Sequence, residues 1–152
     1  MHNTRMKDDL RQLHDVVLDL VSILNEPRRD TALIAAAGIS LDRALFPLLV
    51  RVEKRGPIGV VELADMAGRD HTTVSRQVAK LESLGLVARK ANAADKRVRA
   101  VAITKKGLAM TRALDKARER IAAPAVADWC EADRKTLIRL LRRLVEGARA
   151  SS

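Results

Sequence analysis

The chain of 152 residues contains only two aromatic side chains, Phe46 and Trp129. Hydrophobic residues nevertheless make up 47% of the sequence, with 24 alanines and 20 leucines. A core built from these residues is aliphatic, and alanine with leucine favours closely packed helices over a β-sandwich. The length corresponds to one ordinary domain, or to one compact domain with flanking helices. We therefore expect a mainly α-helical protein.

Apolar residues recur at the three-to-four-residue spacing of amphipathic helices along most of the chain. Pro47 is expected to kink or break the third predicted helix, and Pro124 to bend or end the sixth. Asp70 and Thr104 stand where helix N-caps are expected, whereas Cys130 occupies such a position before the last helix. The predicted helices cover residues 10–24, 31–37, 40–54, 60–66, 71–83 and 104–129, and a final helix includes residues 137–145.

The helical period is interrupted between residues 86 and 103. Residues 86–90 and 98–103 read as two short strands, and the second alternates between apolar and polar or small residues over its first part. The polar segment 91–97 between them has the length of a hairpin connection. The expected fold class is therefore mainly α with a small β-hairpin.

Positive charge is concentrated in one part of the chain. The formal net charge is +10 at pH 7, from 29 basic and 19 acidic residues. Residues 69–106 hold ten basic and three acidic side chains, whereas the first 30 residues hold five and six. Concentrated positive charge is what phosphate neutralisation and counterion release require. The charge distribution indicates a polyanionic partner.

Several other classes of protein are not indicated. No apolar run approaches the ~20 residues needed to span a bilayer, and no signal-peptide pattern begins the chain. The single cysteine, Cys130, excludes an internal disulfide framework and predicts a reducing cytoplasm. His2, His14 and His71 lack ligand-like spacing, so no metal or cofactor is expected. Neither a phosphate-binding glycine loop nor a nucleophile elbow occurs, so we do not expect an enzyme.

Residues 60–85 have the spacing of a helix-turn-helix. In its second helix, Val74, Val78 and Leu81 would face the core. A helix in the major groove of DNA needs short hydrogen-bonding groups and long cations on its outer face. For this helix alone, a merely solvated polar face remains an alternative. The candidate DNA-binding residues of the helix are His71, Thr72, Thr73, Ser75, Arg76 and Lys80.

Basic residues also gather at and beside the predicted hairpin tip, where no core packing requires them. An arginine there suits the narrow, electronegative minor groove. Asp95 is unusual in a phosphate-facing loop unless it orients Arg97. The helix and the basic tip together favour DNA binding over a solvated surface. The candidate DNA-binding residues of the hairpin are Asp95, Lys96, Arg97 and Arg99.

These segments resemble the winged helix-turn-helix of the MarR family of bacterial transcription regulators. The resemblance rests on residues 56–64, 73–87, 95–99 and 103–107, in that order, with a long helix at each end of the chain. It implies a DNA-binding domain at residues 38–107, between N-terminal (1–37) and C-terminal (108–152) dimerisation helices. It also implies a homodimer on a pseudo-palindromic operator in double-stranded DNA, with Arg97 in the minor groove and Asp95 holding it. Gly59, where the family often has a capping Ser or Thr, and Pro47 depart from the pattern.

The apolar stripes of the first and last helices independently indicate dimerisation. Residues 10–24 and 137–145 carry more apolar surface than a winged domain of about 70 residues needs. Either the two stripes cover each other within a monomer, or they form the core of a dimer. A two-fold axis would then place two recognition helices about one DNA turn apart.

The expected function is a sequence-specific DNA-binding transcriptional regulator, acting as a repressor. The resemblance gives a place for a small-molecule effector, between the dimerisation and DNA-binding parts, and the candidate lining residues are His14, Phe46 and Arg51. A sequence-indifferent architectural DNA-binding protein is the alternative, and a winged module that contacts proteins is another. For Cys130 we expect a structural role over a redox role.

Overall fold

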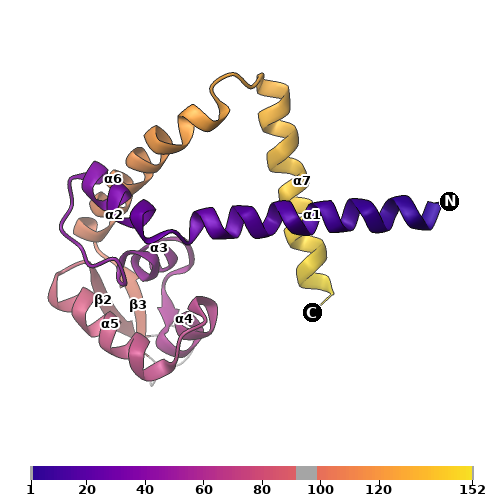
Figure 1. Ribbon diagram of the computed structural model, residues 1–152. Coiled ribbons are helices and arrows are strands. Elements are labelled where there is room, and N and C mark those ends of the chain that lie inside the picture. Colours follow the sequence, from indigo (N-terminus) through magenta and orange to yellow (C-terminus); the bar gives the residue numbers. More distant parts are fainter. Residues whose placement is uncertain (1, 92–98, 152) are drawn as a thin grey trace. The chain divides into compact units, whose positions relative to one another are not determined.

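The computed structural model describes residues 2–91 and 99–151, which form two compact units, one ending at Ala117 and one beginning at Arg118. The described chain is mostly helical with one small antiparallel sheet, which confirms the expected fold class. The first unit contains α1 (His2–Leu24), α2 (Pro27–Ala37), α3 (Phe46–Arg55), β1 (Ile58–Gly59), α4 (Val60–Ala67), α5 (His71–Ser83), β2 (Val87–Ala91), β3 (Arg99–Ile103) and most of α6 (Lys105–Ala122) (Figure 1). The second unit contains the end of α6, the 3-10 turn η1 (Ala123–Val126) and α7 (Glu131–Ala150).

Three helix starts differ from the expectation: α1 begins at His2, eight residues earlier than predicted, and proline explains the other two. Pro27 begins α2 four residues before the predicted start, because its fixed φ suits the first helical turn, where no N–H bond is needed. The helix predicted from Ser40 begins instead at Phe46, with Pro47 in its first turn. Before it, the side chain of Asp42 accepts the N–H of Ala44 at 2.8 Å and closes a turn. Pro47 thus breaks the predicted helix rather than kinking it.

The sheet has the strand order β1-β3-β2, and all neighbours are antiparallel. Val87 pairs with Ile103 and Ala91 with Arg99, as the predicted hairpin requires. The strand β1 was not predicted, because two residues are too short to show alternation. Gly59 both pairs with Ala100 and forms the N-cap of α4, which has no side-chain cap bond. The departure at Gly59 therefore leaves a backbone-only cap.

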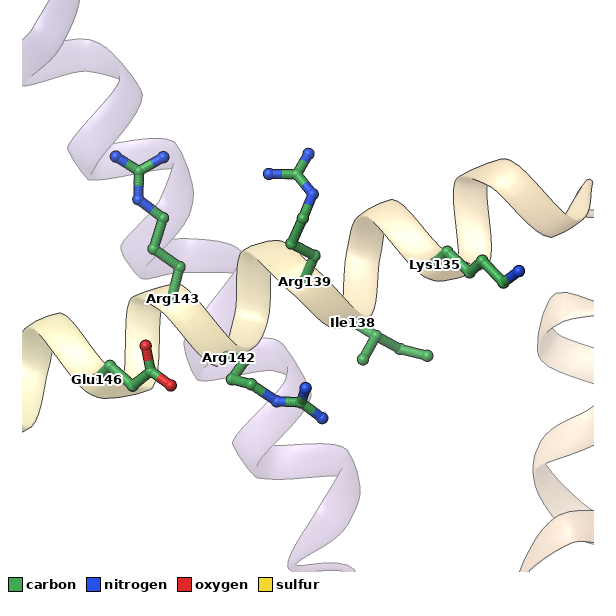
Figure 2. A pocket seen from close by; sticks show the side chains of 6 residues that line it. All are labelled: Lys135, Ile138, Arg139, Arg142, Arg143 and Glu146. Carbon is green, nitrogen blue, oxygen red and sulfur yellow. The ribbon is translucent and has the colours of Figure 1, made fainter.

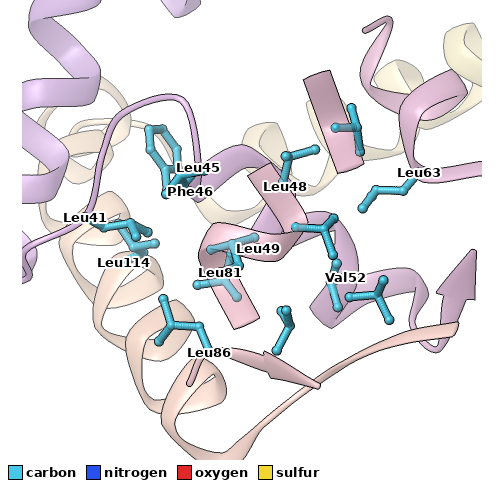
Figure 3. Close-up of a cluster of buried hydrophobic side chains, with 14 of the residues drawn as sticks. Leu41, Leu45, Phe46, Leu48, Leu49, Val52, Leu63, Leu81, Leu86 and Leu114 are labelled. Carbon is cyan, nitrogen blue, oxygen red and sulfur yellow. The ribbon is translucent and has the colours of Figure 1, made fainter. Parts of the chain in front are cut away.

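The core of the first unit is aliphatic, as the composition predicts. Side chains from α3, α4, α5, β2 and α6 converge in it, and Phe46 supplies its one aromatic ring (Figure 3). Trp129, in the second unit, is 38% exposed. Within residues 2–91 and 99–151, no helix has both the length and the hydropathy that a membrane span requires. The fully buried large side chains are Leu48, Leu49, Leu63, Leu81, Leu86, Leu114, Val52, Val74, Val78, Val87, Val101 and Thr111.

The start of α6 is bonded to the end of α5. The hydroxyl of Thr104 donates to the carbonyl of Gly85 at 2.6 Å and accepts the N–H of Gly107 at 3.1 Å, which confirms Thr104 as a cap. The ammonium of Lys106 donates to the carbonyl of Leu84 at 2.9 Å. Carbonyls at a helix end lack partners within the helix. Side chains at the start of α6 therefore donate hydrogen bonds to the carbonyls of Leu84 and Gly85, which follow α5.

We predict that Gly107→Ala destabilises the protein, because a Cβ at this position would overlap the carbonyl oxygen of Leu86 and lie 2.8 Å from Cγ1 of Ile103. Overpacking of this kind costs about 1–3 kcal/mol of unfolding free energy, measured by urea titration. Gly147→Ala is the matched control in α7, where a Cβ meets nothing within 4 Å. It should leave stability unchanged or raise it by up to ~1 kcal/mol. Equal stability of the two variants would contradict the close contact.

Candidate nucleic-acid interface

The start of α5 is fixed by a side-chain cap. One carboxylate oxygen of Asp70 accepts the N–H of Thr73 at 2.9 Å, and the other accepts the Thr73 hydroxyl. The bond from the hydroxyl, which has the larger effect, and the bond from the N–H hold the pKa of the Asp70 carboxyl below its ordinary value of 3.8. Asp70 was predicted as the cap, and the prediction is confirmed. Thr73, a candidate DNA-binding residue, is thereby engaged in capping.

The remainder of α5 divides into two faces. Val74, Val78 and Leu81 are fully buried against the core. Because each helical residue turns by about 100°, Arg76 lies almost opposite this stripe. Neither Arg76 nor Lys80 has an ion-pair partner among residues 2–91 and 99–151. The exposed residues on the outer side of α5 are Thr72, Thr73, Ser75, Arg76, Ala79, Lys80 and Ser83.

Ala79 on this outer face was not singled out from the sequence. It lies between the two cations along the helix and is exposed. A small side chain allows a groove wall to approach the backbone closely. Its position on the same helical face as Arg76 was the signal that could have identified it.

His71 lies at the first position of α5 and is exposed. Its Nε2 is 3.3 Å from Oδ1 of Asp65 in α4, so the two helices of the helix-turn-helix are linked at this point. His71 therefore stands at the edge of the outer face.

Only part of the predicted wing can be placed. Arg99 is the first residue of β3, opposite Ala91, and is exposed. Asp95, Lys96 and Arg97 lie outside the described residues. Their contacts with DNA stay predictions, as does the contact of Arg99.

Of the eight basic residues between 69 and 106 that the structure describes, three are bonded within the protein. Lys106 bonds to Leu84, as described above, and Nε of Arg89 lies 3.7 Å from Oε2 of Glu82. Arg69 donates to two acceptors in the first unit. No short-range pattern in the sequence indicates these partners, because each cation and its acceptor are separated along the chain. Fewer cationic side chains are therefore free to contact phosphates than the residue count indicates, although Arg69 and Lys106, whose acceptors are neutral, keep their charge.

An open groove of about 500 Å³ lies beside the end of α5. It combines aliphatic walls with one cation and one carboxylate. Within the described chain, no group of three or more His, Cys, Asp or Glu residues is arranged to hold a metal ion. The groove is lined by Ile34, Ile39, Ser40, Leu41, Asp42, Leu45, Lys80 and Leu84.

The three candidate effector residues do not line this groove. His14 is exposed on α1, and Phe46 is buried in the core. Arg51 is partly buried and donates to the carbonyl of Pro47, one turn earlier in α3, at 3.1 Å. The groove beside α5 is a different place from the one that these residues indicate, and their effector role stays a prediction.

Comparison with known proteins gives the family. The model of the MarR family matches residues 41–98. YxaD of Bacillus subtilis (strain 168), described as an uncharacterized HTH-type transcriptional regulator, is 31% identical over 105 residues, which are 69% of this chain and 73% of YxaD. This chain belongs to the MarR family. Members of the MarR family are DNA-binding transcriptional regulators and not enzymes, and they typically dimerise.

Solved structures agree with the fold. A MarR family protein from Bacillus stearothermophilus matches with a TM-score of 0.79 at 20% identity, over 94% of this chain and 97% of that protein. The crystal structure of MarR matches with a TM-score of 0.69 at 25% identity, over 88% of this chain and 98% of MarR. The winged helix-turn-helix expected from the sequence is therefore confirmed.

We predict that the Asp70 cap stabilises this MarR-family protein in a pH-dependent way. The bonds from Thr73 favour the carboxylate and lower its pKa in the folded state, so the stabilisation is present above pH 3.8 and is lost as the pH falls through the lowered value. Asp70→Ala should reduce the melting temperature at neutral pH, and the difference from wild type should narrow below about pH 4.

Asp70→Asn is the matched control, since asparagine caps helices as well as aspartate but does not titrate. It should melt close to wild type at neutral pH and lose the titration at this site. A difference between Asp70→Ala and wild type that stays constant down to about pH 2 would rule out a role for the carboxylate charge.

Proposed function

We propose that the chain is a homodimeric repressor that binds a pseudo-palindromic operator in double-stranded DNA. The outer face of α5 carries this proposal. It presents Arg76 and Lys80 to solvent, with Thr72 and Ser75 beside them, opposite a fully buried stripe. These groups can contact base edges and phosphates when the helix enters the major groove. The bound dimer would exclude other proteins from the operator, which is how it would repress transcription.

Each group on α5 has a chemistry that fits DNA. The guanidinium of Arg76 can donate two parallel hydrogen bonds to a guanine edge or clamp a phosphate. Lys80, one turn later, supplies a point charge for a phosphate. In the wing, Arg99 is exposed at the start of β3. The family resemblance implies that Arg97 enters the minor groove and that Asp95 orients Arg97. The proposed docking combines base reading by α5 with anchoring by the wing.

The apolar stripe of α1 supports dimerisation. Within the first unit the stripe is uncovered, with its side chains between 40% and 64% exposed. An apolar surface of this extent in a water-facing helix marks an interaction site. A second copy of the chain would cover it. The stripe consists of Leu10, Leu13, Val16, Leu20, Val21 and Leu24.

The stripe of α7 has the same character. No residue of α7 is buried, and its apolar side chains are between 39% and 55% exposed. Basic side chains flank the stripe, and Figure 2 shows Arg139 and Arg143 on the side of the helix opposite Ile138. A dimer contact through the apolar stripe would leave these cations in water. The stripe consists of Leu137, Ile138, Leu140, Leu141, Leu144 and Val145.

We also propose that a small-molecule effector releases the operator, in a bacterial cytoplasm. A ligand shifts an equilibrium only by binding the two states with different affinity. The groove of about 500 Å³ includes Lys80 of α5 and Leu84, which follows the helix, so a bound molecule there would contact the recognition helix directly. A sequence-indifferent architectural protein remains the alternative function. It would lose affinity with salt and show no preference for any operator.

The test of sequence-specific binding is to enrich fragments of the source genome on the purified protein and to measure the affinity of the selected site. A repressor of this type should prefer that site over random duplex at physiological salt and should reduce transcription from it. Absence of a preferred site would favour the architectural alternative.

Arg76→Ala is predicted to weaken operator binding by about 1–3 kcal/mol, because it removes a bidentate donor from the outer face. Gel-shift titration against the selected operator measures the effect. Arg112→Ala removes the same charge from the exposed side of α6 and serves as the control. Wild-type affinity in Arg76→Ala would remove Arg76 from the interface.

Leu20→Asp in α1 and Leu141→Asp in α7 are each predicted to convert the dimer into a monomer, since each places a carboxylate in the apolar contact. Sedimentation equilibrium gives the mass directly. Arg139→Ala, outside the α7 stripe, should remain a dimer. A monomeric wild type, or dimers that survive both leucine substitutions, would contradict the proposed contact.

A further inference from the structure

Arg69 joins the turn before α3 to the recognition helix. It lies in the turn between α4 and α5, where its N–H donates to the carbonyl of Ala64 at 3.1 Å. Its Nη1 donates to the carbonyl of Ala44 at 2.9 Å and to Oε1 of Gln77 at 3.0 Å. Because Nη1 carries two hydrogens, each acceptor receives its own bond. One nitrogen thus connects two segments of the chain, at Ala44, 25 residues before Arg69, and at Gln77, 8 residues after it.

The acceptor on the α3 side is held in place. The side chain of Asp42 accepts the N–H of Ala44 at 2.8 Å, and the backbone carbonyl of Asp42 accepts the N–H of Leu45 at 2.9 Å. Leu41 and Leu45, on either side of this turn, are buried in the core. The carbonyl of Ala44 is therefore a fixed point, to which Arg69 is bonded.

The acceptor on α5 lies between its two faces. Gln77 is partly buried and follows Arg76 directly, one residue before the buried Val78. Burial of aliphatic side chains is non-directional, so it tolerates a small rotation of the helix. A hydrogen bond requires a narrow range of distance and angle. The bond from Arg69 to Gln77 therefore restricts the rotation of α5 about its axis.

We propose that Arg69 is a positioning residue for DNA recognition, which sets the direction of Arg76 and Lys80 without touching DNA; the inference rests on the sequence-specific binding proposed above. Hydrogen bonds to base edges depend on the orientation of the donor. Non-specific binding depends chiefly on the number of charges near the phosphates. Arg69 thus contributes to the preference for an operator over random duplex, rather than to affinity for DNA in general.

Arg69→Lys and Gln77→Ala separate these contributions. Lysine keeps the charge, but its ammonium ends one bond shorter and lacks the guanidinium geometry. Gln77→Ala removes the acceptor and leaves all charges in place. Affinities for the selected operator and for random duplex are measured over a range of salt concentrations. Arg112→Lys, at an exposed position of α6, is the control for the exchange of arginine for lysine.

We expect each substitution to lower the ratio of operator to random-duplex affinity about tenfold, with the random-duplex affinity and its salt slope unchanged. The double variant should lose no more than Arg69→Lys alone, because both substitutions remove the bond between Arg69 and Gln77. Arg112→Lys should keep the wild-type ratio.

Melting temperatures separate positioning from simple stabilisation. Variants that melt lower but keep the wild-type ratio, when measured well below their melting temperatures, would overturn the positioning role. Equal losses for operator and random duplex would also overturn it. If Arg69→Lys does not fold, Gln77→Ala alone decides by the same criteria. A wild-type protein without any preferred operator would refute the proposed function itself, and the positioning role with it.

Discussion

Burial of the aliphatic stripe of α5 is the interaction on which the candidate DNA surface depends. Val74, Val78 and Leu81 are fully removed from solvent, and burying each side chain contributes about 1.5–3 kcal/mol. Once these residues face the core, the helical turn of about 100° per residue directs Arg76 outward. The core can accept them because it is almost entirely aliphatic. The recognition face is thus a consequence of what lies on the opposite side of the same helix.

Hydrogen bonds fix the two ends of α5, in addition to the burial of its apolar stripe. The Asp70 carboxylate fixes the first turn of α5, and residues at the start of α6 bond to the carbonyls of Leu84 and Gly85 just beyond its last turn. These bonds satisfy backbone groups that a helix end leaves without partners. Some of the basic residues serve this purpose instead of meeting phosphates. The basic composition therefore combines a structural role with an electrostatic one.

The sequence predicted what short-range patterns encode. Periodicity located α4 and α5 and the division of α5 into two faces, and the cap residues Asp70 and Thr104 were recognised by type and position. The start of α3, the strand β1 and the bonds of Arg69 depend on contacts between distant segments. No periodic or capping signal marks such contacts. The same limit applies to the site, whose outward residues were predicted but whose supporting bonds were not.

The placement of Trp129 has a practical consequence for spectroscopy. The chain has no tyrosine, and its one indole lies in the second unit, partly open to water. The first unit contains only the phenyl ring of Phe46. Intrinsic fluorescence excited near the red edge of protein absorption therefore arises from the second unit alone. Emission from the native protein follows events around Trp129, while the first unit, which contains α5, is optically silent and needs an introduced fluorophore.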